Sequence, residues 1–242
     1  MNQKIFFQIF RESFKDLIKN PLIIFPGFFL WLFLTLFSKI SVSVNQGFTN
    51  TIHLSLWLSF FGLVSVIFMS FIFAGLIRVS QEIILTKKTK IQNFFSGGKK
   101  FFFGSVIVTL AIIIIGIIIQ RTAHFIALQI GKVFQLNLLP ALFIFLVIYF
   151  IGLISGLIWL TFANVKLVVE NKNAFMAIKS SANLVKKEYL ATLSLSVIFF
   201  VFFWLTRKFN GIIPELIEYI LIIPFLALVL TRFVLASEKL KK

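Results

Sequence analysis

The sequence predicts an all-α fold: a polytopic integral membrane protein with six transmembrane helices, built as a single membrane domain over residues 1–242. Of the 242 residues, 60% are hydrophobic and only 13% are charged, and the mean hydropathy is +1.03. Soluble domains are about 45–50% apolar and about 25% charged, so a soluble fold of this length cannot bury so much apolar surface. The chain contains no cysteine, which excludes disulfides, thiolate metal sites and cysteine nucleophiles.

Six apolar runs reach or approach the length needed to cross a hydrocarbon core of about 30 Å. They cover residues 22–37, 54–77, 101–119, 138–163, 190–205 and 212–236. Pro26 in the first run and Pro224 in the last are expected to kink their helices, as gating hinges or, more commonly, as static kinks. Gly152 and Gly156 form a GxxxG pattern in the fourth run, which allows close helix approach within the bundle or in a dimer.

Basic residues are concentrated in alternate polar segments between these runs. The chain has 24 Lys and Arg against 8 Asp and Glu, a net charge of +16, and most of the basic residues lie in the N-terminal segment, the second and fourth connections and the C-terminal tail. Short loops rich in Lys and Arg stay in the cytoplasm. We therefore expect a multi-pass protein of the cell membrane with both termini cytoplasmic. Nucleic acid is not an expected partner, because no single basic surface collects the charge.

A cleavable signal over residues 1–43 is the alternative for the N-terminal region, since Ser41 and Ser43 are small residues suited to a cleavage site. The leading segment is long for a signal and mixes acidic with basic residues. Pro21 and Pro26 also interrupt the apolar run. These features favour a retained first span.

Amphipathic stretches precede the first, third and fifth runs and are expected to lie at the cytoplasmic interface. In the first stretch one face holds Phe6, Phe10, Phe14 and Leu17, opposite Gln8, Arg11, Lys15 and Lys19. The weaker middle stretch starts with a capping-box pattern from Thr89 to Gln92, and Gly97 and Gly98 are expected to end it.

The most complete amphipathic stretch covers about residues 173–187 and predicts a helix that lies flat on the inner membrane surface. Its apolar face comprises Phe175, Ile178, Ala182 and Val185. Asn173 is a suitable N-cap. Anionic lipid headgroups, the expected partners on the cytoplasmic side, would be contacted by Lys172, Lys179, Lys186 and Lys187.

Charged pairs four residues apart follow the second and fourth runs: Arg78 with Glu82, and Lys166 with Glu170. Such pairs predict that both helices continue a turn or more beyond the membrane. Together with the amphipathic stretches they divide the chain into three similar units, residues 1–77, 78–163 and 164–242. The two interpretations are a threefold pseudo-repeat of helical hairpins and the periodicity that charged inner loops give to any six-span chain.

Two segments resemble a loosely defined group of six-span membrane families. They are LVVENKNAFMAIKSSANLVKK, within residues 164–190, and FRESFKDLIKNPLIIFPGFF near the start. The group includes the membrane domain attached to some glycerophosphodiester phosphodiesterases, and several uncharacterised bacterial and archaeal families. The resemblance implies a helical integral membrane domain and transfers no catalytic residue. A soluble phosphodiesterase domain does not occur in these 242 residues, so that activity is not expected of them.

Four ionisable residues on the predicted outer side are the candidates for a metal site: His53, His124, Glu215 and Glu218. Imidazole and carboxylate ligands suit zinc, but the histidines lie in different loops and their spacing matches no metal motif. Glu215 and Glu218 follow Pro214, a pattern typical of acids that complement the dipole in the first turn of a helix. A structural role is favoured, and neither a cofactor nor a catalytic residue is expected.

The middles of the six runs contain no ionisable residue, which argues against an ion-coupled pump. We expect a non-enzymatic carrier, a permease-like protein or an accessory membrane component that handles lipid or an apolar solute. One alternative is a scaffold that recruits a soluble partner through its inner helices. The other is a membrane enzyme with a His/Glu metal site on its outer face. Both homo- and hetero-oligomers remain open.

Overall fold

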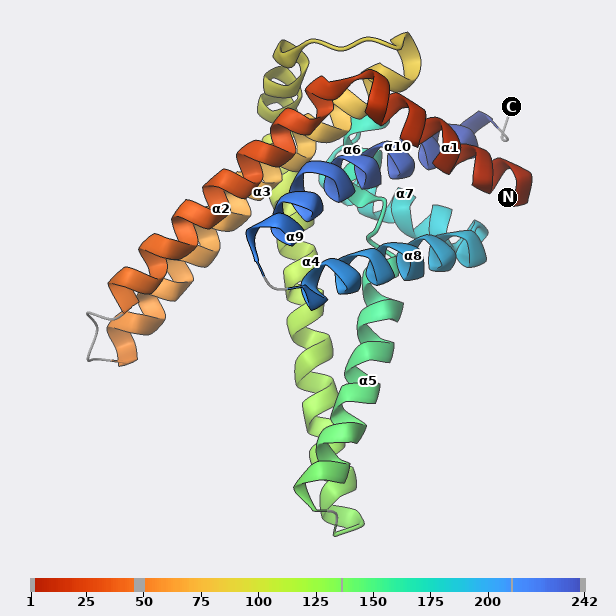
Figure 1. Ribbon diagram of the computed structural model, residues 1–242. Helices are drawn as coiled ribbons and strands as arrows, with labels where there is room; N and C mark the ends of the chain where they lie inside the picture. The colour runs from red at the N-terminus through yellow and green to blue at the C-terminus, as the bar shows by residue number, and fades with distance from the viewer. Residues whose placement is uncertain (1–2, 46–50, 136, 210, 240–242) are drawn as a thin grey trace.

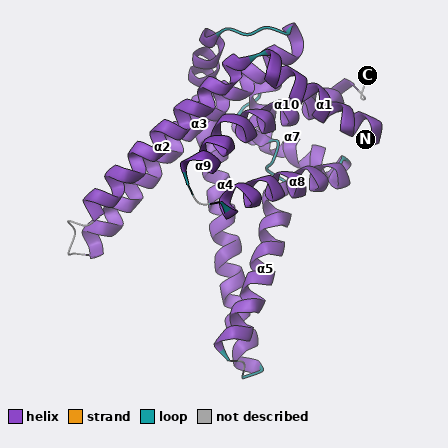
Figure 2. Cartoon of the chain, in the orientation of Figure 1, coloured by secondary structure: helices purple, strands orange, loops and turns teal. Residues whose placement is uncertain are grey.

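The computed structural model describes residues 3–45, 51–135, 137–209 and 211–239, and these form helices without a strand (Figures 1 and 2). In chain order the elements are α1 (Gln3–Lys19), a 3₁₀ turn η1 (Pro21–Ile23), α2 (Ile24–Asn45), α3 (Thr51–Thr86), α4 (Ile91–Val133), α5 (Leu138–Ile158), α6 (Ala163–Val169), α7 (Ala174–Lys187), α8 (Tyr189–Lys208), α9 (Ile212–Ile217), a π-helical turn η2 (Glu218–Ile222) and α10 (Ile223–Lys239). The prediction of an all-α fold is therefore confirmed.

Among the described residues, five helical segments are long and apolar enough to cross a membrane. They are Pro21–Val44, His53–Thr86, Ile91–Val133, Tyr189–Thr206 and Ile212–Glu238. Each covers one of the predicted apolar runs, and together they make the chain a polytopic membrane protein. The remaining predicted run corresponds to α5, whose apolar stretch Leu139–Gly152 is shorter than these five segments.

The fourth run does not form one helix to residue 163, and the predicted extension past it was wrong. α5 ends at Ile158 and the chain turns before α6 begins. Ser181 of α7 stabilises this turn, because its hydroxyl accepts a hydrogen bond from the Phe162 amide at 3.2 Å and donates one to the Trp159 carbonyl at 2.7 Å. A side chain from another helix thus replaces the hydrogen bonds that a continuous helix would have made.

The predicted extension of the second run is present, since α3 continues to Thr86. The predicted pair between Arg78 and Glu82 does not form. Arg78 donates instead to the side-chain oxygen of Gln81 at 2.9 Å. Glu82 accepts a hydrogen bond from the Thr89 hydroxyl at 3.0 Å, so Thr89 is engaged there and no side chain caps α4. The capping-box prediction was therefore wrong.

Gly97 and Gly98 do not end a short surface helix, as was predicted, because α4 runs through them without a break. Both glycines are buried against α3. A Cβ atom on Gly97 would overlap the Cβ of Arg78, and one on Gly98 would lie 2.7 Å from the Phe71 ring. The bare backbone lets the two helices approach closely, and the buried packing outweighs the low helix propensity of glycine.

Two hairpins, α2–α3 and α4–α5, leave the same end of the molecule and diverge from each other (Figure 1). Within the second hairpin, Gly152 and Gly156 lie against Ile119 of α4. A Cβ atom on Gly152 would be 2.6 Å from a methyl carbon of Ile119, and one on Gly156 would be 2.5 Å from another. This GxxxG face therefore packs inside the chain, where it permits close contact between α4 and α5.

The last apolar segment changes its helical form at the π turn η2. Pro224 lies two residues after this turn, as the second residue of α10, and lacks the amide that would donate to the turn before it, which is a recognised cause of local helix irregularity. Gly27 of α2 packs on the same turn, where a Cβ atom would overlap the carbonyl oxygen of Tyr219. Its neighbour Pro26 lies in the first turn of α2, where a missing amide removes no α-helical hydrogen bond.

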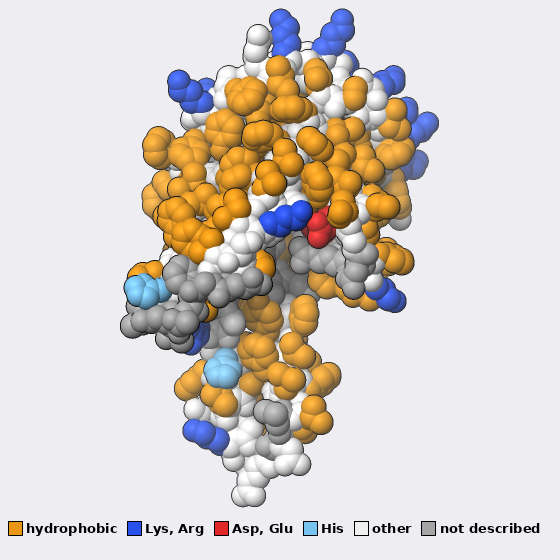
Figure 3. All heavy atoms as spheres, turned by 60° about the vertical axis from the view of Figure 1, so that its left-hand side comes forward, with side chains coloured by type: hydrophobic (Ala, Val, Ile, Leu, Met, Phe, Trp, Pro, Cys, Tyr) orange, Lys and Arg blue, Asp and Glu red, His pale blue; other side chains and the backbone are white. Residues whose placement is uncertain are grey.

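The buried core lies at the end where the two hairpins meet α1, α6, α7 and α10. Its largest fully buried side chains include Phe94, Phe162 and Phe233. Away from this end the hairpins expose large apolar side chains such as Ile118 and Phe143, as expected of surfaces that face lipid. Figure 3 shows Lys and Arg side chains gathered along the uppermost end of the molecule, above a broad hydrophobic surface.

Candidate functional site

The four candidate metal ligands are carried by separate elements of the structure. His53 lies on α3 and His124 lies on α4, which belong to the two diverging hairpins, and Figure 3 shows the histidine side chains at separate places. Over the part of the chain that the structure describes, no three His, Asp or Glu side chains form a group that could hold a metal ion. The alternative of a His/Glu metal site on the outer face therefore finds no cluster of ligands among the described residues.

Glu215 and Glu218 instead line a cavity of about 400 Å³ between α2, α8 and the α9–η2 segment. Glu215 lies in the first turn of α9, as predicted, whereas Glu218 begins the π turn. The Glu218 side chain is only 7% exposed, and its carboxylate lies 3.4 Å from the Thr206 hydroxyl. This buried acid helps to join the end of α8 to the last apolar segment.

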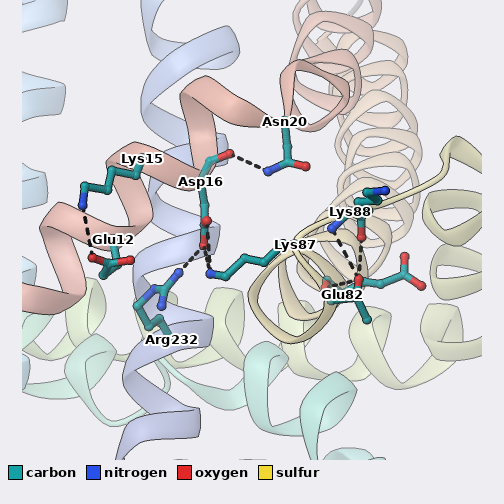
Figure 4. A network of polar contacts seen from close by, with 9 residues as sticks. Glu12, Lys15, Asp16, Asn20, Glu82, Lys87, Lys88 and Arg232 are labelled. Atoms are coloured by element: carbon teal, nitrogen blue, oxygen red, sulfur yellow. Dashed lines mark hydrogen bonds and ion pairs between the residues drawn. The ribbon is translucent and has the colours of Figure 1, made fainter.

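Asp16 of α1 forms the first of two ionic clusters on the basic end of the molecule (Figure 4). It is the only aspartate in the chain and is 4% exposed. Its carboxylate pairs with Arg232 of α10 and with Lys87, whose ammonium lies 3.3 Å away. Lys87 follows the last residue of α3 in a left-handed conformation, with a φ of 62°. One carboxylate thus ties α1 to α10 and to the α3–α4 connection.

Lys166 of α6 forms the second cluster and is 1% exposed. It pairs with Glu170 and with Glu238 of α10, the latter at 3.1 Å. Glu170 also pairs with Lys172 and accepts a hydrogen bond from the Ser180 hydroxyl at 3.0 Å. The cluster links α6, α7 and α10, and every charge in it faces an opposite charge, as burial requires.

Burial raises the pKa of Glu170, but hydrogen bonds from Glu238, Lys166 and Lys172 outweigh this effect and lower the pKa to about 2. The carboxylate is therefore ionised throughout the physiological range. Lys172 was predicted to contact lipid headgroups, but its ammonium is engaged by Glu170 and by the Ser180 hydroxyl at 3.2 Å. Contact between Lys172 and lipid headgroups therefore stays a prediction, with the Glu170 carboxylate as a competing partner for its ammonium.

α7 packs on the bundle mainly through residues outside the face that was predicted to lie on the membrane, with Val185 common to both. Its buried residues are Ala174, Ala177, Ser181, Leu184 and Val185. Phe175, placed on the apolar face by the sequence, is 76% exposed. Lys179, Lys186 and Lys187 are exposed as well. The N-cap prediction is confirmed, since the Asn173 side-chain oxygen accepts a hydrogen bond from the Met176 amide at 2.9 Å.

An apolar groove of about 820 Å³ lies between α1, α8 and the η2–α10 junction. Among the residues that line it are Phe6, Phe7, Phe10 and Phe14 of α1, Ile198 and Phe202 of α8, and Ile222 and Phe225. The rings contact one another across the groove. The Phe225 centroid lies 6.1 Å from that of Phe10 and 6.3 Å from that of Phe14. This volume falls within the range of about 300–1,000 Å³ typical of ligand sites.

The position of α1 creates the groove. Asn20 closes the C-terminal end of α1, because its backbone and side-chain nitrogens both donate to the Asp16 carbonyl, at 3.1 and 3.0 Å. Pro21 then begins the 3₁₀ turn that leads into α2. The break directs α1 back across the molecule at an angle to α2 (Figure 1). The pairs made by Asp16 hold α1 there, with its aromatic stripe over α8 and Phe225.

Arg11 is the one charged residue among those that line the groove. The sequence placed it on the face opposite the phenylalanines, and that placement was wrong. At 100° per residue, Phe7, Arg11, Phe14 and Ile18 fall on a single stripe, and all four line the groove. Arg11 therefore borders the apolar surface. Helical periodicity applied to this second stripe would have placed Arg11 beside the phenylalanines from the sequence alone.

A family model described as a domain of unknown function, DUF7847, matches residues 6–237. Neither the curated proteins nor the solved structures include a match to the chain. The predicted resemblance is thus supported only as membership of a family of unknown function. Nothing in the comparisons links the chain to the membrane domain of glycerophosphodiester phosphodiesterases.

Proposed function

The chain belongs to the DUF7847 family, and from its own geometry we propose that it is a non-enzymatic membrane component that binds lipid. It would act as a carrier or as an accessory subunit of a larger assembly. The observation that carries this proposal is the 820 Å³ groove between α1, α8 and the η2–α10 junction. A groove lined by aromatic and aliphatic side chains takes an apolar ligand, because burying apolar surface is favourable wherever polar partners are few.

The groove's chemistry suits binding. Its floor and walls offer the carbon surfaces of side chains such as Phe10, Phe202 and Phe225. Arg11 is the one charged residue that lines the groove, and the nearby carboxylate of Asp16 is already committed to its ion pairs with Arg232 and Lys87. The pair between Asp16 and Arg232 holds α1 against α10, two of the elements that line the groove, which supports a role in shaping the site.

The proposed topology places both termini on the cytoplasmic side of the cell membrane. It is supported by the basic end of the molecule in Figure 3 and by the exposed lysines on α7, namely Lys179, Lys186 and Lys187. Positive residues next to spanning segments stay in the cytoplasm and attract anionic lipid there. In this orientation the groove opens in the inner half of the membrane, close to the headgroups.

A scaffold is the second candidate, and the outward face of α7 is the observation that favours it. Phe175 and Met176 are both exposed there, beside Lys179. An apolar pair within a basic surface suits the inner membrane interface or an acidic protein partner. The scaffold predicts that Phe175→Ser abolishes co-purification of a stoichiometric soluble protein. Lipid binding in the groove would be unchanged by that substitution.

Native mass spectrometry of the purified protein tests the lipid proposal. The parent should retain about one lipid per chain through detergent exchange. A groove-filling double variant, Ile198→Trp with Leu221→Trp, should lose it, since both side chains line the groove. The control, Val197→Trp with Ile217→Trp, adds the same bulk to exposed positions of the same segments that do not line it. Equal retention in the two double variants would contradict the proposal.

A further inference from the structure

We infer that the groove takes an anionic phospholipid, with one acyl chain along the phenylalanines and the phosphate at Arg11. This inference rests on the proposed lipid-binding function and names the class of lipid. It depends on three features of α1: where Arg11 lies, what the neighbouring charges contact, and which end of the molecule α1 occupies.

Arg11 lies at the border between the apolar stripe and the polar side of α1. Phe7 and Phe14 flank it on the stripe, four and three residues away, and both are more than half exposed. The Arg11 side chain is itself exposed and lines the groove. A ligand with an apolar tail along the stripe would therefore bring its polar end to the guanidinium, in the same way that long basic side chains reach an interface from an apolar surface.

The Arg11 guanidinium has no ion-pair partner among the described residues. The two acids of α1 are engaged elsewhere, since Glu12 pairs with Lys15 at 3.6 Å and Asp16 pairs with Arg232 and Lys87. The positive charge at the edge of the groove is therefore not neutralised by its own helix. Charge complementarity points to an anionic ligand.

A phosphate fits this position better than other anionic groups. The planar guanidinium offers parallel N–H donors that match the oxygens of a phosphate. α1 also lies at the end of the molecule where basic residues gather (Figures 1 and 3), which is where a bilayer supplies anionic phospholipid at high local concentration. A phospholipid therefore has an acyl chain that fits the apolar groove and a negatively charged phosphate that can pair with the Arg11 guanidinium.

The test is a competition read by native mass spectrometry of the full chain in detergent micelles. The protein is offered equal amounts of phosphatidylglycerol and phosphatidylcholine with the same acyl chains. The parent should bind phosphatidylglycerol about tenfold more than phosphatidylcholine, because both lipids carry the phosphate but only phosphatidylcholine adds a choline cation, which Arg11 repels. Arg11→Gln should still bind lipid but lose this preference, and Arg11→Lys should keep part of it.

Lys15→Gln is the matched control, because it removes the same charge from the same helix at a residue that does not line the groove. It should keep the full preference. Two results would overturn the inference while leaving lipid binding intact: no headgroup preference in the parent, or an equal loss of preference in Arg11→Gln and Lys15→Gln. A fatty acid of the same chain length that competes as well as phosphatidylglycerol would overturn the assignment of a phosphate. Failure of the parent to bind any lipid would instead contradict the proposed function itself.

Discussion

Asp16 and Lys166 show how single residues hold the basic end of this protein together. Each is almost fully buried and contacts two opposite charges. At least one of the two partners is carried by another element, Arg232 for Asp16 and Glu238 for Lys166. A buried charge is tolerated only when it is paired, and removal of one partner leaves the other exposed to the full cost of burial. Disrupting either cluster is therefore expected to destabilise the protein mainly by leaving a buried charge unpaired.

Asp16→Asn should lower the free energy of unfolding by roughly 3–5 kcal/mol, because it leaves the largely buried Arg232 without its carboxylate. Chemical unfolding in detergent micelles measures this change. Glu12→Gln is the control on the same helix, since it breaks only the exposed pair with Lys15 and should cost about 0–1 kcal/mol. Similar losses in the two variants would show that the Asp16 pairs do not hold α1 in place.

The low pKa of Glu170 predicts a pH dependence. Its pKa of about 2 lies below the ordinary value of 4.5, so the folded state favours the ionised form. The resulting stabilisation is fully present above about pH 4.5 and is lost as the pH falls through that value toward 2. Glu170→Gln should remove this part of the stability at neutral pH and flatten the decline between pH 4.5 and 2. A decline as steep in Glu170→Gln as in the parent would refute the assignment.

At the scale of elements, close approach of the backbones shapes the fold more than helix propensity does. α4 continues through Gly97 and Gly98 because both face α3, and α2 crosses η2 at Gly27. In contrast, the fourth apolar run is divided into α5 and α6 because the Ser181 hydroxyl of α7 hydrogen-bonds the backbone amide and carbonyl groups of the turn between them. In each case the deciding contact comes from another element.

Gly97→Ala should destabilise the protein by about 1–3 kcal/mol, because the added Cβ would overlap the Cβ of Arg78, an atom fixed by its own backbone. Gly116→Ala in the same helix meets nothing within 4 Å. It should stabilise the helix by about 0.5–1 kcal/mol through propensity alone. Thermal unfolding of both variants compares them directly, and a loss of stability in Gly116→Ala as large as in Gly97→Ala would contradict this account of the α3–α4 contact.

The whole molecule has a basic end that carries the core, the ionic clusters and the groove, and apolar hairpins that extend away from it. This division predicts its topology. Because the chain contains no cysteine, single cysteines at Lys90 and Lys187 should react only with reagents that reach the cytoplasm. A cysteine at Gln129, near the far end of α4, should react with an impermeant reagent added outside. The reverse pattern would invert the orientation proposed here.

The helical fold and the position of each apolar helix follow from composition and apolar run length, because these signals are local. The groove and the ionic clusters depend on residues far apart in the chain. Asp16 and Arg232 are separated by 216 positions, and no sequence periodicity connects them. The stripe that carries Arg11 is an intermediate case. Its residues are local, but only the position of α1 over Phe225 makes them the wall of a site.

The central claim is that a lipid chain occupies the groove between α1, α8 and η2, and photo-crosslinking locates that chain most directly. A phosphatidylglycerol with a diazirine in one acyl chain is added at one equivalent per protein in detergent, and the labelled residues are mapped by mass spectrometry. The account predicts labels concentrated around Phe10, Ile198 and Phe225, and their loss in the variant that combines Ile198→Trp with Leu221→Trp. Labels spread over the exposed faces of α4 and α5, unchanged in that variant, would contradict it.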